Sequence, residues 1–199
     1  MKRFATIIMM IFLVALSYAQ LPFSKGIVGG VNLTNYGGGD VDDIDVSSKA
    51  GVAGGIFMEF KLLNISVAPE VLYVKAGAEY EGDYSGVPVT YSDRLSYIQI
   101  PVMGRFYLPF LPLLKPYVTA GPYFNYLLSA KTEFKVNGQT EELDLDNVSK
   151  KQDSGVKIGV GLKLTRIAVS ARYSMGLSKI RKDADVKNKA AELMLSIYF

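Results

Sequence analysis

The last ten residues, AAELMLSIYF, alternate strictly between two kinds of side chain. One set is apolar and ends on an aromatic ring: Ala191, Leu193, Leu195, Ile197 and Phe199. The other set includes Glu192 and Ser196. A period of two residues places successive side chains on opposite faces of a β-strand, so the segment predicts a strand with one apolar face. That face continues to the final aromatic residue, whereas the end of a soluble domain usually frays into polar residues.

Seven other segments show the same pattern, rich in β-branched and aromatic residues and bounded by turn residues. They cover residues 24–35, 50–60, 65–78, 94–108, 116–131, 152–164 and 166–177. Apolar residues make up 49% of the chain, yet the best helical candidate after the N-terminal region, residues 106–118, contains three helix-breaking prolines. Hydrophobicity diluted to every second position is typical of a transmembrane barrel. We therefore predict an all-β protein, an eight-stranded antiparallel up-and-down transmembrane β-barrel.

The predicted connections alternate between long and short along the chain. The long ones are residues 36–49, 79–93, 132–151 and 178–189, and the short ones are residues 61–64, residues 109–115 and a turn at Thr165. All but four of the 19 acidic residues fall in the long connections. This alternation is typical of outer-membrane barrels, which have long extracellular loops and short periplasmic turns.

The N-terminal region has the features of an export signal. Residues 1–19 combine two basic residues, an apolar stretch and a small-x-small ending at Ser17-Tyr18-Ala19. An N-terminal membrane anchor is the alternative, but the apolar stretch is short for a span of about 20 residues. We therefore expect a signal peptide over residues 1–19 and an outer-membrane β-barrel domain over residues 20–199.

Six charged residues lie on the faces of the predicted strands that alternate with apolar ones. They are Glu59, Glu70, Arg105, Lys157, Arg172 and Glu192. Eight strands enclose a space that side chains can fill, so we expect these residues to form a hydrogen-bonded ionic core in the lumen rather than to line a pore. A buried charge needs a partner, which makes a structural role the first interpretation. A proton or ion path is the alternative.

Aromatic residues near the predicted periplasmic strand ends suggest an interfacial girdle facing lipid. We assign Phe60, Phe106, Tyr117 and Phe199 to it. Lys75 and Arg94 do not fit the alternation, because both share the parity of apolar residues. Either they lie at a rim, where long basic side chains reach the interface, or Pro69 introduces a bulge that shifts the register.

Several chemistries lack their usual residues. The chain contains no His and no Cys, so a Cys nucleophile or a typical His/Cys metal site cannot be built. The glycines of GVKIGVG, residues 155–161, are followed by neither a helix nor a phosphate-binding Lys-Ser/Thr pair, and we interpret them as part of a curved barrel strand. We expect no enzyme activity, no catalytic residue, no cofactor and no metal site. The small net charge of the chain without residues 1–19 argues against nucleic-acid binding.

The chain also resembles a known family. The motifs E-x-x-Y at Glu70 to Tyr73, Y-I-Q-I-P at residues 97–101, A-G-P at residues 120–122 and R-Y-x-x-G-L at residues 172–177 are similar to those of the PorT-type outer-membrane β-barrel proteins common in Bacteroidetes. The resemblance implies an eight-stranded outer-membrane barrel with no general activity. One family member takes part in a protein-secretion and gliding apparatus, a role that shared scaffold motifs do not transfer.

We therefore expect an integral protein of the cell outer membrane with a structural or interaction role, such as an accessory of an envelope or secretion machine. Its expected partners are outer-membrane lipids, including lipopolysaccharide, and an envelope protein bound through residues 79–93 and 132–151. The basic segment at residues 178–189 is interpreted first as forming ion pairs with the neighbouring acidic loops, and contact with lipopolysaccharide phosphates or with a protein is the alternative. Two alternatives are a small permeability or transport barrel and a soluble periplasmic lipocalin-like ligand binder.

Overall fold

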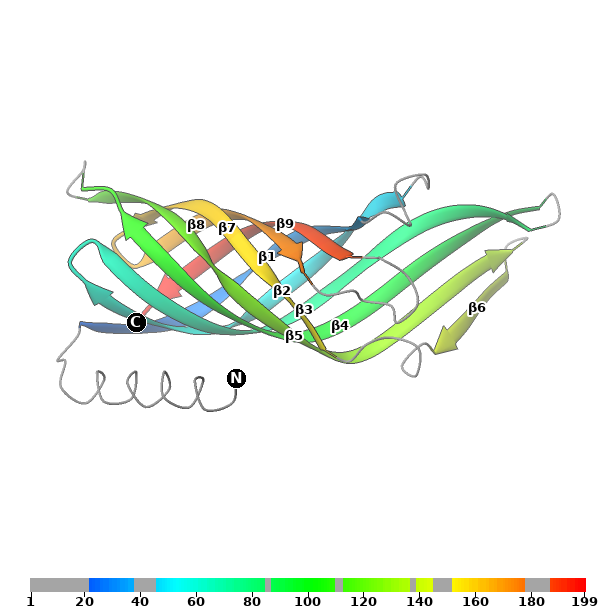
Figure 1. Ribbon diagram of the computed structural model, residues 1–199, viewed down its shortest axis with the longest axis horizontal. Helices are drawn as coiled ribbons and strands as arrows, with labels where there is room; N and C mark the ends of the chain where they lie inside the picture. Colours follow the sequence, from blue (N-terminus) through cyan, green and yellow to red (C-terminus); the bar gives the residue numbers. More distant parts are fainter. Residues whose placement is uncertain are drawn as a thin grey trace.

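The computed structural model describes residues 22–37, 46–84, 87–109, 113–136, 139–144, 152–177 and 187–199. They form nine strands (Figure 1). The strands are β1 (Phe23–Gly37), β2 (Val46–Leu62), β3 (Ile65–Tyr84), β4 (Val87–Tyr107), β5 (Leu114–Val136), β6 (Gln139–Asp144), β7 (Gln152–Leu164), β8 (Ile167–Gly176) and β9 (Lys187–Tyr198). The predicted signal peptide and most of the predicted connections 36–49 and 178–189 lie outside these residues. No helix in the described ranges is long and apolar enough to cross a membrane.

Eight of the strands close into a barrel. Each pairs antiparallel with its neighbours in the order β4-β3-β2-β1-β9-β8-β7-β5, and pairing of β4 with β5 completes the ring. The sixth strand, β6, pairs with β5 outside the ring. All eight predicted segments fall within or overlap the barrel strands, so the predicted fold is confirmed.

Side-chain burial alternates along the strands with the predicted period. In β8 every second residue is buried from Ala168 to Gly176, and the residues between them are exposed. Exposed apolar residues occur on every barrel strand and include Ile27, Ile56, Val71, Ile100, Val118, Val160, Val169 and Leu195. The apolar face therefore points out of the barrel and the polar face into it, which is the arrangement of a barrel surrounded by lipid.

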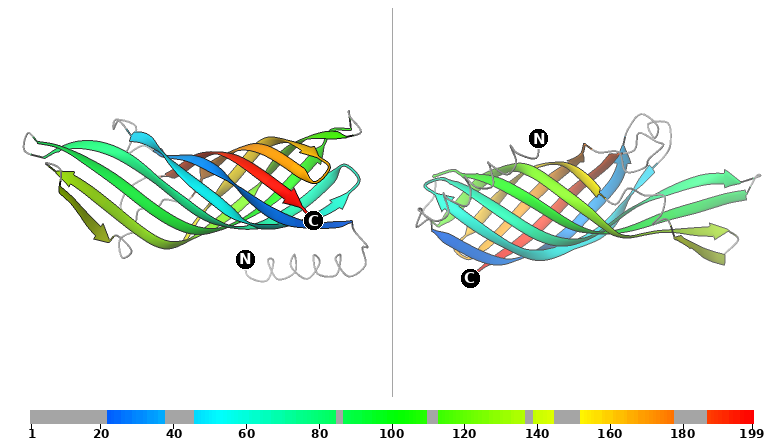
Figure 2. Two further views of the ribbon diagram at one scale, coloured as in Figure 1. Left: turned by 180° about the vertical axis from the view of Figure 1, so that it is seen from behind. Right: turned by 60° about the horizontal axis from the view of Figure 1, so that its bottom comes forward.

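One end of the barrel, here called the short-turn end, is closed by tight connections. Leu62 pairs with Ile65 and Leu164 pairs with Ile167, so two residues make each turn. The first turn residues, Leu63 and Thr165, have positive φ values of 55° and 51°. A positive φ is unfavourable for a β-branched residue such as Thr165. The first barrel strand begins at this end, where Phe23 pairs with Phe60. The last barrel strand also ends here, where Tyr198 donates a backbone hydrogen bond to Arg166, next to the turn residue Thr165 (Figures 1 and 2).

The opposite end, here called the hairpin end, differs from the prediction. Residues 79–93 were expected to form a loop, but β3 continues to Tyr84 and pairs with β4 from Val87 onward. In residues 132–151, β5 runs to Val136 and pairs with β6. These strands project beyond the rest of the barrel (Figures 1 and 2). The prediction was wrong because it took the change to polar residues as the end of a strand, whereas antiparallel pairing needs only the backbone.

The alternation passes through Pro69 without interruption. Ala68 and Glu70 are buried and Val71 is exposed, so no bulge resets the register there. Lys75 is accordingly exposed on the outward face. The register shifts lie elsewhere, between β2 and β3 near Ser48 and Ala53, and between β4 and β5 near Ser96 and Tyr97.

Candidate functional site: a lumen crossed by ion pairs

All six charged residues predicted to lie in the lumen are buried there. Glu59, Glu70, Arg105, Lys157, Arg172 and Glu192 are each at most 7% exposed. They come from six different strands, β2, β3, β4, β7, β8 and β9. The period of two residues turns them inward, and closure of the barrel brings them together.

Glu70 is the centre of the largest group of contacts. Arg172 donates to both of its carboxylate oxygens, over 2.7 Å from Nη1 and 3.0 Å from Nη2. Arg105 donates a third hydrogen bond, 2.8 Å from Nη2 to Oε1. A carboxylate that accepts two or more charge-assisted hydrogen bonds is held strongly in position, because such bonds are about twice as strong as neutral ones.

Glu59 forms a second group nearer the short-turn end. It accepts hydrogen bonds from Ser66 over 2.6 Å and from Tyr107 over 2.5 Å. Lys163 donates to its other oxygen over 3.3 Å, and Arg105 lies 3.6 Å from that same oxygen. Lys163 was not among the residues predicted to lie in the lumen, although it shares the parity of Lys157.

Lys157 and Glu192 form a third, compact pair. Lys157 Nζ lies 2.6 and 2.8 Å from the two carboxylate oxygens of Glu192. Ser174 donates a further hydrogen bond of 3.1 Å to Glu192. Glu192 is also the cross-strand neighbour of Arg172, so this pair adjoins the group around Glu70.

Three of these contacts join strands on opposite sides of the barrel. In the ring order, β3 lies opposite β8, β4 opposite β9, and β2 opposite β7. The corresponding contacts are Glu70 with Arg172, Arg105 with Tyr198 over 2.8 Å, and Glu59 with Lys163. These hydrogen bonds therefore cross the lumen from one wall to the opposite one.

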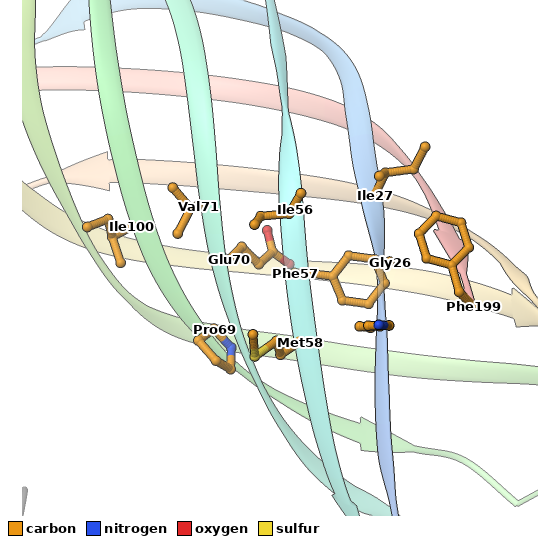
Figure 3. Close-up of a pocket in the computed structure, with 11 residues that line it drawn as sticks. Gly26, Ile27, Ile56, Phe57, Met58, Pro69, Glu70, Val71, Ile100 and Phe199 are labelled. Atoms are coloured by element: carbon orange, nitrogen blue, oxygen red, sulfur yellow. The ribbon is translucent and has the colours of Figure 1, made fainter.

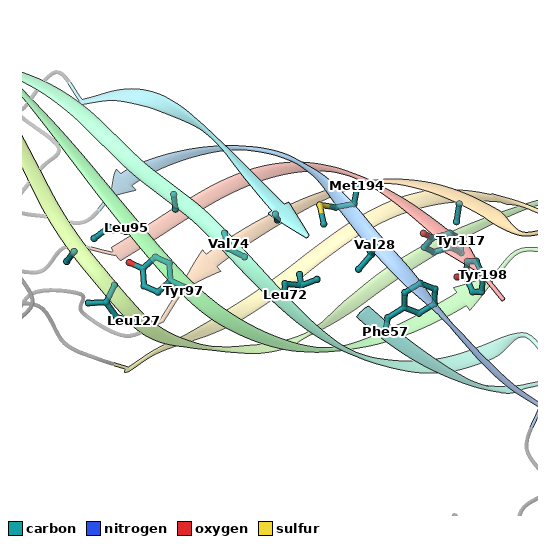
Figure 4. Close-up of a cluster of buried hydrophobic side chains, with 14 of the residues drawn as sticks. Val28, Phe57, Leu72, Val74, Leu95, Tyr97, Tyr117, Leu127, Met194 and Tyr198 are labelled. Carbon is teal, nitrogen blue, oxygen red and sulfur yellow. The ribbon is translucent and has the colours of Figure 1, made fainter. Parts of the chain in front are cut away.

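An aromatic layer lies beside the ionic groups toward the short-turn end. Phe57 meets Tyr198 edge to face with ring centroids 4.8 Å apart, and Tyr107 lies 5.2 Å from Tyr117. The Lys163 ammonium lies 3.4 Å from the centre of the Tyr198 ring, a cation–π contact. Figure 4 shows Phe57, Tyr117 and Tyr198 close together inside the barrel.

The assignment of Tyr117 to the lipid-facing girdle was therefore wrong. Tyr117 is 2% exposed and shares the inward parity of buried Thr119, while Val118 between them is exposed. Its cross-strand partner is Gly161, and a Cβ atom at Gly161 would overlap the Tyr117 ring. The ring therefore occupies space that a side chain at residue 161 would otherwise fill. The prediction placed Tyr117 by its nearness to a strand end and neglected its parity.

The other three proposed girdle residues do not lie in the lumen. Phe106 and Phe199 are exposed on the outer face, and Phe60 is half-buried against Phe23 with centroids 5.6 Å apart. Phe199 also borders an apolar groove of about 360 Å³, whose lining includes Ile27, Ile56 and Ile100 (Figure 3). These apolar side chains are exposed on the outer face, so the groove is a depression in the outer surface of the barrel.

The hairpin-end half of the lumen is different in character. Gln99 donates to Asn125 over 2.8 Å, and Asn125 donates to Asp153 over 3.2 Å. Three buried oxygens have no hydrogen-bond partner among the residues that the structure describes: Gln99 Oε1, Asp153 Oδ1 and Asn32 Oδ1. Buried side chains that include Leu95, Tyr97 and Leu127 lie in the lumen beyond these hydrogen-bonded residues (Figure 4). The prediction did not assign Asp153 to the lumen, although it shares the parity of Lys157, and it did not consider the uncharged residues.

The carboxylates of the lumen are engaged by other groups of this chain. Within the described ranges, no group of three or more Asp, Glu, His or Cys residues could hold a metal ion. Each carboxylate oxygen of Glu59, Glu70 and Glu192 already accepts a hydrogen bond from this chain.

The closed ring, outward apolar face and inward ionic core define a transmembrane β-barrel of the outer-membrane type. Residues 18–182 match the model of the outer membrane protein beta-barrel domain family, and the chain belongs to that family. No curated protein sequence matches it significantly.

Solved structures that are similar to this chain share little sequence identity with it, and the first of them supports the same fold. The chain is 12% identical to Neisserial surface protein A, with a TM-score of 0.50, over 89% of this chain and 99% of that one. The attachment invasion locus protein Ail of Yersinia pestis is 15% identical, with a TM-score of 0.46, over 88% and 98% of the two chains. OprG of Pseudomonas aeruginosa is 9% identical, with a TM-score of 0.40, over 90% and 97%.

Proposed function

We propose that this outer-membrane barrel has a structural or interaction role and that it neither conducts solutes nor catalyses a reaction. The observation that carries the proposal is the set of hydrogen bonds between opposite walls, Glu70 with Arg172, Arg105 with Tyr198 and Glu59 with Lys163. A small permeability barrel would need a water-filled passage where these bonds lie. A lipocalin-like binder would need an apolar interior and a polar exterior, the reverse of what the alternation gives.

The hairpin end is the proposed interaction surface. Bacterial barrels turn their short connections toward the periplasm, so the extended strands of β3, β4, β5 and β6 would project from the cell surface. Beyond the barrel rim these four strands pair in the order β3-β4-β5-β6. A paired sheet presents a more rigid surface to an envelope protein than a free loop would. We propose that residues 79–93 and 132–144 bind such a partner, and that export depends on a signal peptide at residues 1–19.

We further propose that the chain is of the PorT type. Two motifs that carry this resemblance meet in the lumen, because Glu70 begins the E-x-x-Y motif and Arg172 begins the R-Y-x-x-G-L motif. The two residues form the ion pair that crosses the barrel at 2.7 Å. A contact between the motifs accounts for their presence in one sequence as parts of a single scaffold.

Bilayer recordings and membrane fractionation test the proposal together. The full chain should be recovered from outer membranes as a band whose gel mobility changes on boiling, and it should give no steady, reproducible conductance steps in planar bilayers. Steady steps of one size would overturn the non-conducting assignment. Recovery in the soluble periplasmic fraction without a change in mobility would overturn the membrane assignment itself.

The interaction role needs a separate variant. Replacing residues 79–92 with a two-residue turn removes the part of the β3–β4 hairpin that projects from the hairpin end. The parts of β3 and β4 that belong to the barrel wall stay intact. The variant should keep its heat-modifiable band and lose chemical cross-links to any partner that the unmodified chain gives in intact cells. A trimmed barrel that keeps the same cross-links would place the interaction elsewhere.

A further inference from the structure

The outer face of β3, β4 and β5 changes character toward the hairpin end. Tyr73 pairs with Ile98, and Ile98 pairs with Tyr126, so two outward tyrosines flank one isoleucine in a single row. Tyr73 and Tyr126 are exposed. Tyrosine rings at the edge of an apolar band mark the level at which hydrocarbon gives way to lipid headgroups.

The next outward position on β3 is basic. From Ile65 to Tyr73 the outward residues of β3 are uncharged, and this stretch of nine residues is what a tilted strand needs to cross the hydrocarbon layer. Lys75 follows two residues later and is exposed. The Lys75 ammonium therefore lies at headgroup level rather than in hydrocarbon.

The register places two further basic residues beside Lys75. Lys75 pairs with Ser96 on β4, and the next position of the same parity on β4 is Arg94. Arg94 pairs directly with Lys131 on β5. Three adjacent strands thus bring three basic residues to neighbouring positions just beyond the tyrosine row. This position fits the first of the two explanations for the parity of Lys75 and Arg94, in which both residues lie at a rim.

The backbone pairing also limits the site on its outer side. Glu79 pairs with Ser92, and Ser92 pairs with Glu133, so acidic residues follow in the next row away from the membrane. Lys131 also pairs with Asp144 of β6, so a second acidic residue borders the basic residues on the β6 side. Carboxylates repel phosphate groups, so an anion would be confined to the positions of Lys75, Arg94 and the adjoining side of Lys131.

We propose that the cluster of Lys75, Arg94 and Lys131, which occupy neighbouring positions in two successive outward rows, binds the phosphates of a lipid A-type glycolipid in the outer leaflet, with its acyl chains lying on the apolar wall below Tyr73 and Tyr126. The assignment rests on the proposed orientation, in which the hairpin end faces the cell exterior. Arginine offers a bidentate fork for phosphate and lysine a point charge. Two phosphates on one headgroup match three neighbouring cations better than the single phosphate of a phospholipid.

The test measures lipid retention by native mass spectrometry of the full chain extracted in detergent. The barrel is titrated separately with bisphosphorylated lipid A, with phosphatidylglycerol and with inorganic phosphate as a competitor. The variant K75Q/R94Q/K131Q should weaken lipid A binding by about a hundredfold, from about a factor of five per basic residue. The matched control is Lys25→Gln, because Lys25 is exposed on the outer face of β1 at the opposite end of the barrel.

The expected result is a loss of lipid A confined to the triple variant, little retention of phosphatidylglycerol by any form, and no competition from inorganic phosphate. Unchanged lipid A binding in the triple variant, an equal loss in Lys25→Gln, or equal retention of phosphatidylglycerol would overturn the proposal. Heat-modifiable gel mobility of every variant, with protease access to the hairpin end in intact cells, tests the barrel and its orientation independently. Failure of the lipid site is thereby distinguishable from failure of the proposed function.

Discussion

The buried carboxylates in the two halves of the lumen differ in how fully they are hydrogen bonded and ion-paired. Toward the short-turn end, every carboxylate oxygen of Glu59 and Glu70 is hydrogen bonded and both residues meet cations from the far wall. Toward the hairpin end, Asp153 has one bonded and one unbonded oxygen, and no described cation forms an ion pair with it. The first half is held by specific bonds across the barrel. The second half contains buried acceptors whose ordinary partner is water.

The largest effect should come from breaking the first half at its centre. Glu70→Ala leaves Arg105 and Arg172 buried without their shared anion, and removing one partner of a buried ion pair costs about 3–5 kcal/mol. The free energy of unfolding, followed through the fraction of folded band in urea, should fall by that amount. A loss below about 1 kcal/mol, typical of an exposed pair, would show that the lumen is hydrated at this level.

Variants of the Lys157–Glu192 pair distinguish the contribution of charge to stability from that of packing. Lys157→Met alone leaves Glu192 without its cation and should cost about 3 kcal/mol. The double variant K157M/E192M removes both charges and keeps similar volumes, so it should be close to the parent in stability. Urea unfolding of the parent, both single variants and the double variant gives the coupling free energy. Additive single effects would mean that the two residues do not depend on each other.

Glycine positions test whether the inward tyrosines are packed as tightly as the ionic groups. Gly161→Ala places a methyl group where the Tyr117 ring lies and should cost about 1–3 kcal/mol, as overpacking does. The matched control is Gly29→Ala, whose added Cβ would face outward with its nearest neighbour, Ala53 O, at 3.6 Å. Thermal or urea unfolding should show the control unchanged or slightly stabilised. Equal effects at the two positions would contradict the layer packing.

A smaller gain is expected at the short-turn end. Thr165 has a φ of 51°, a conformation that asparagine and glycine adopt more readily than a β-branched residue. Thr165→Asn should therefore raise the free energy of unfolding by about 1 kcal/mol. The same urea titration measures it, with Ser170→Asn in the wall of the lumen as a destabilising counterpart. No gain at Thr165 would mean that the turn relaxes in solution.

These contrasts also show which features follow from sequence. Parity is a local property of a strand, so it placed Glu59, Arg105 and Glu192 inside without any tertiary information. It would have placed Tyr117 and Lys163 inside as well, had it been applied to them. Opposite walls meet only after closure, and no local pattern reports which cation on β8 reaches which anion on β3. The length of the β3–β4 hairpin was hidden for the same reason, because pairing between polar residues leaves no hydrophobic signal.

The smallest predicted effect lies in the hairpin-end half. Asp153→Asn removes a buried charge that has no described counter-ion and keeps an oxygen able to accept the hydrogen bond from Asn125. Because an unpaired buried charge is costly, its removal should leave stability within about 1 kcal/mol of the parent or raise it slightly. Urea unfolding beside Glu70→Gln, the isosteric change at the centre of the ionic half, gives the comparison directly. A loss at Asp153 as large as at Glu70 would require a counter-charge there, and the two halves of the lumen would then be built alike.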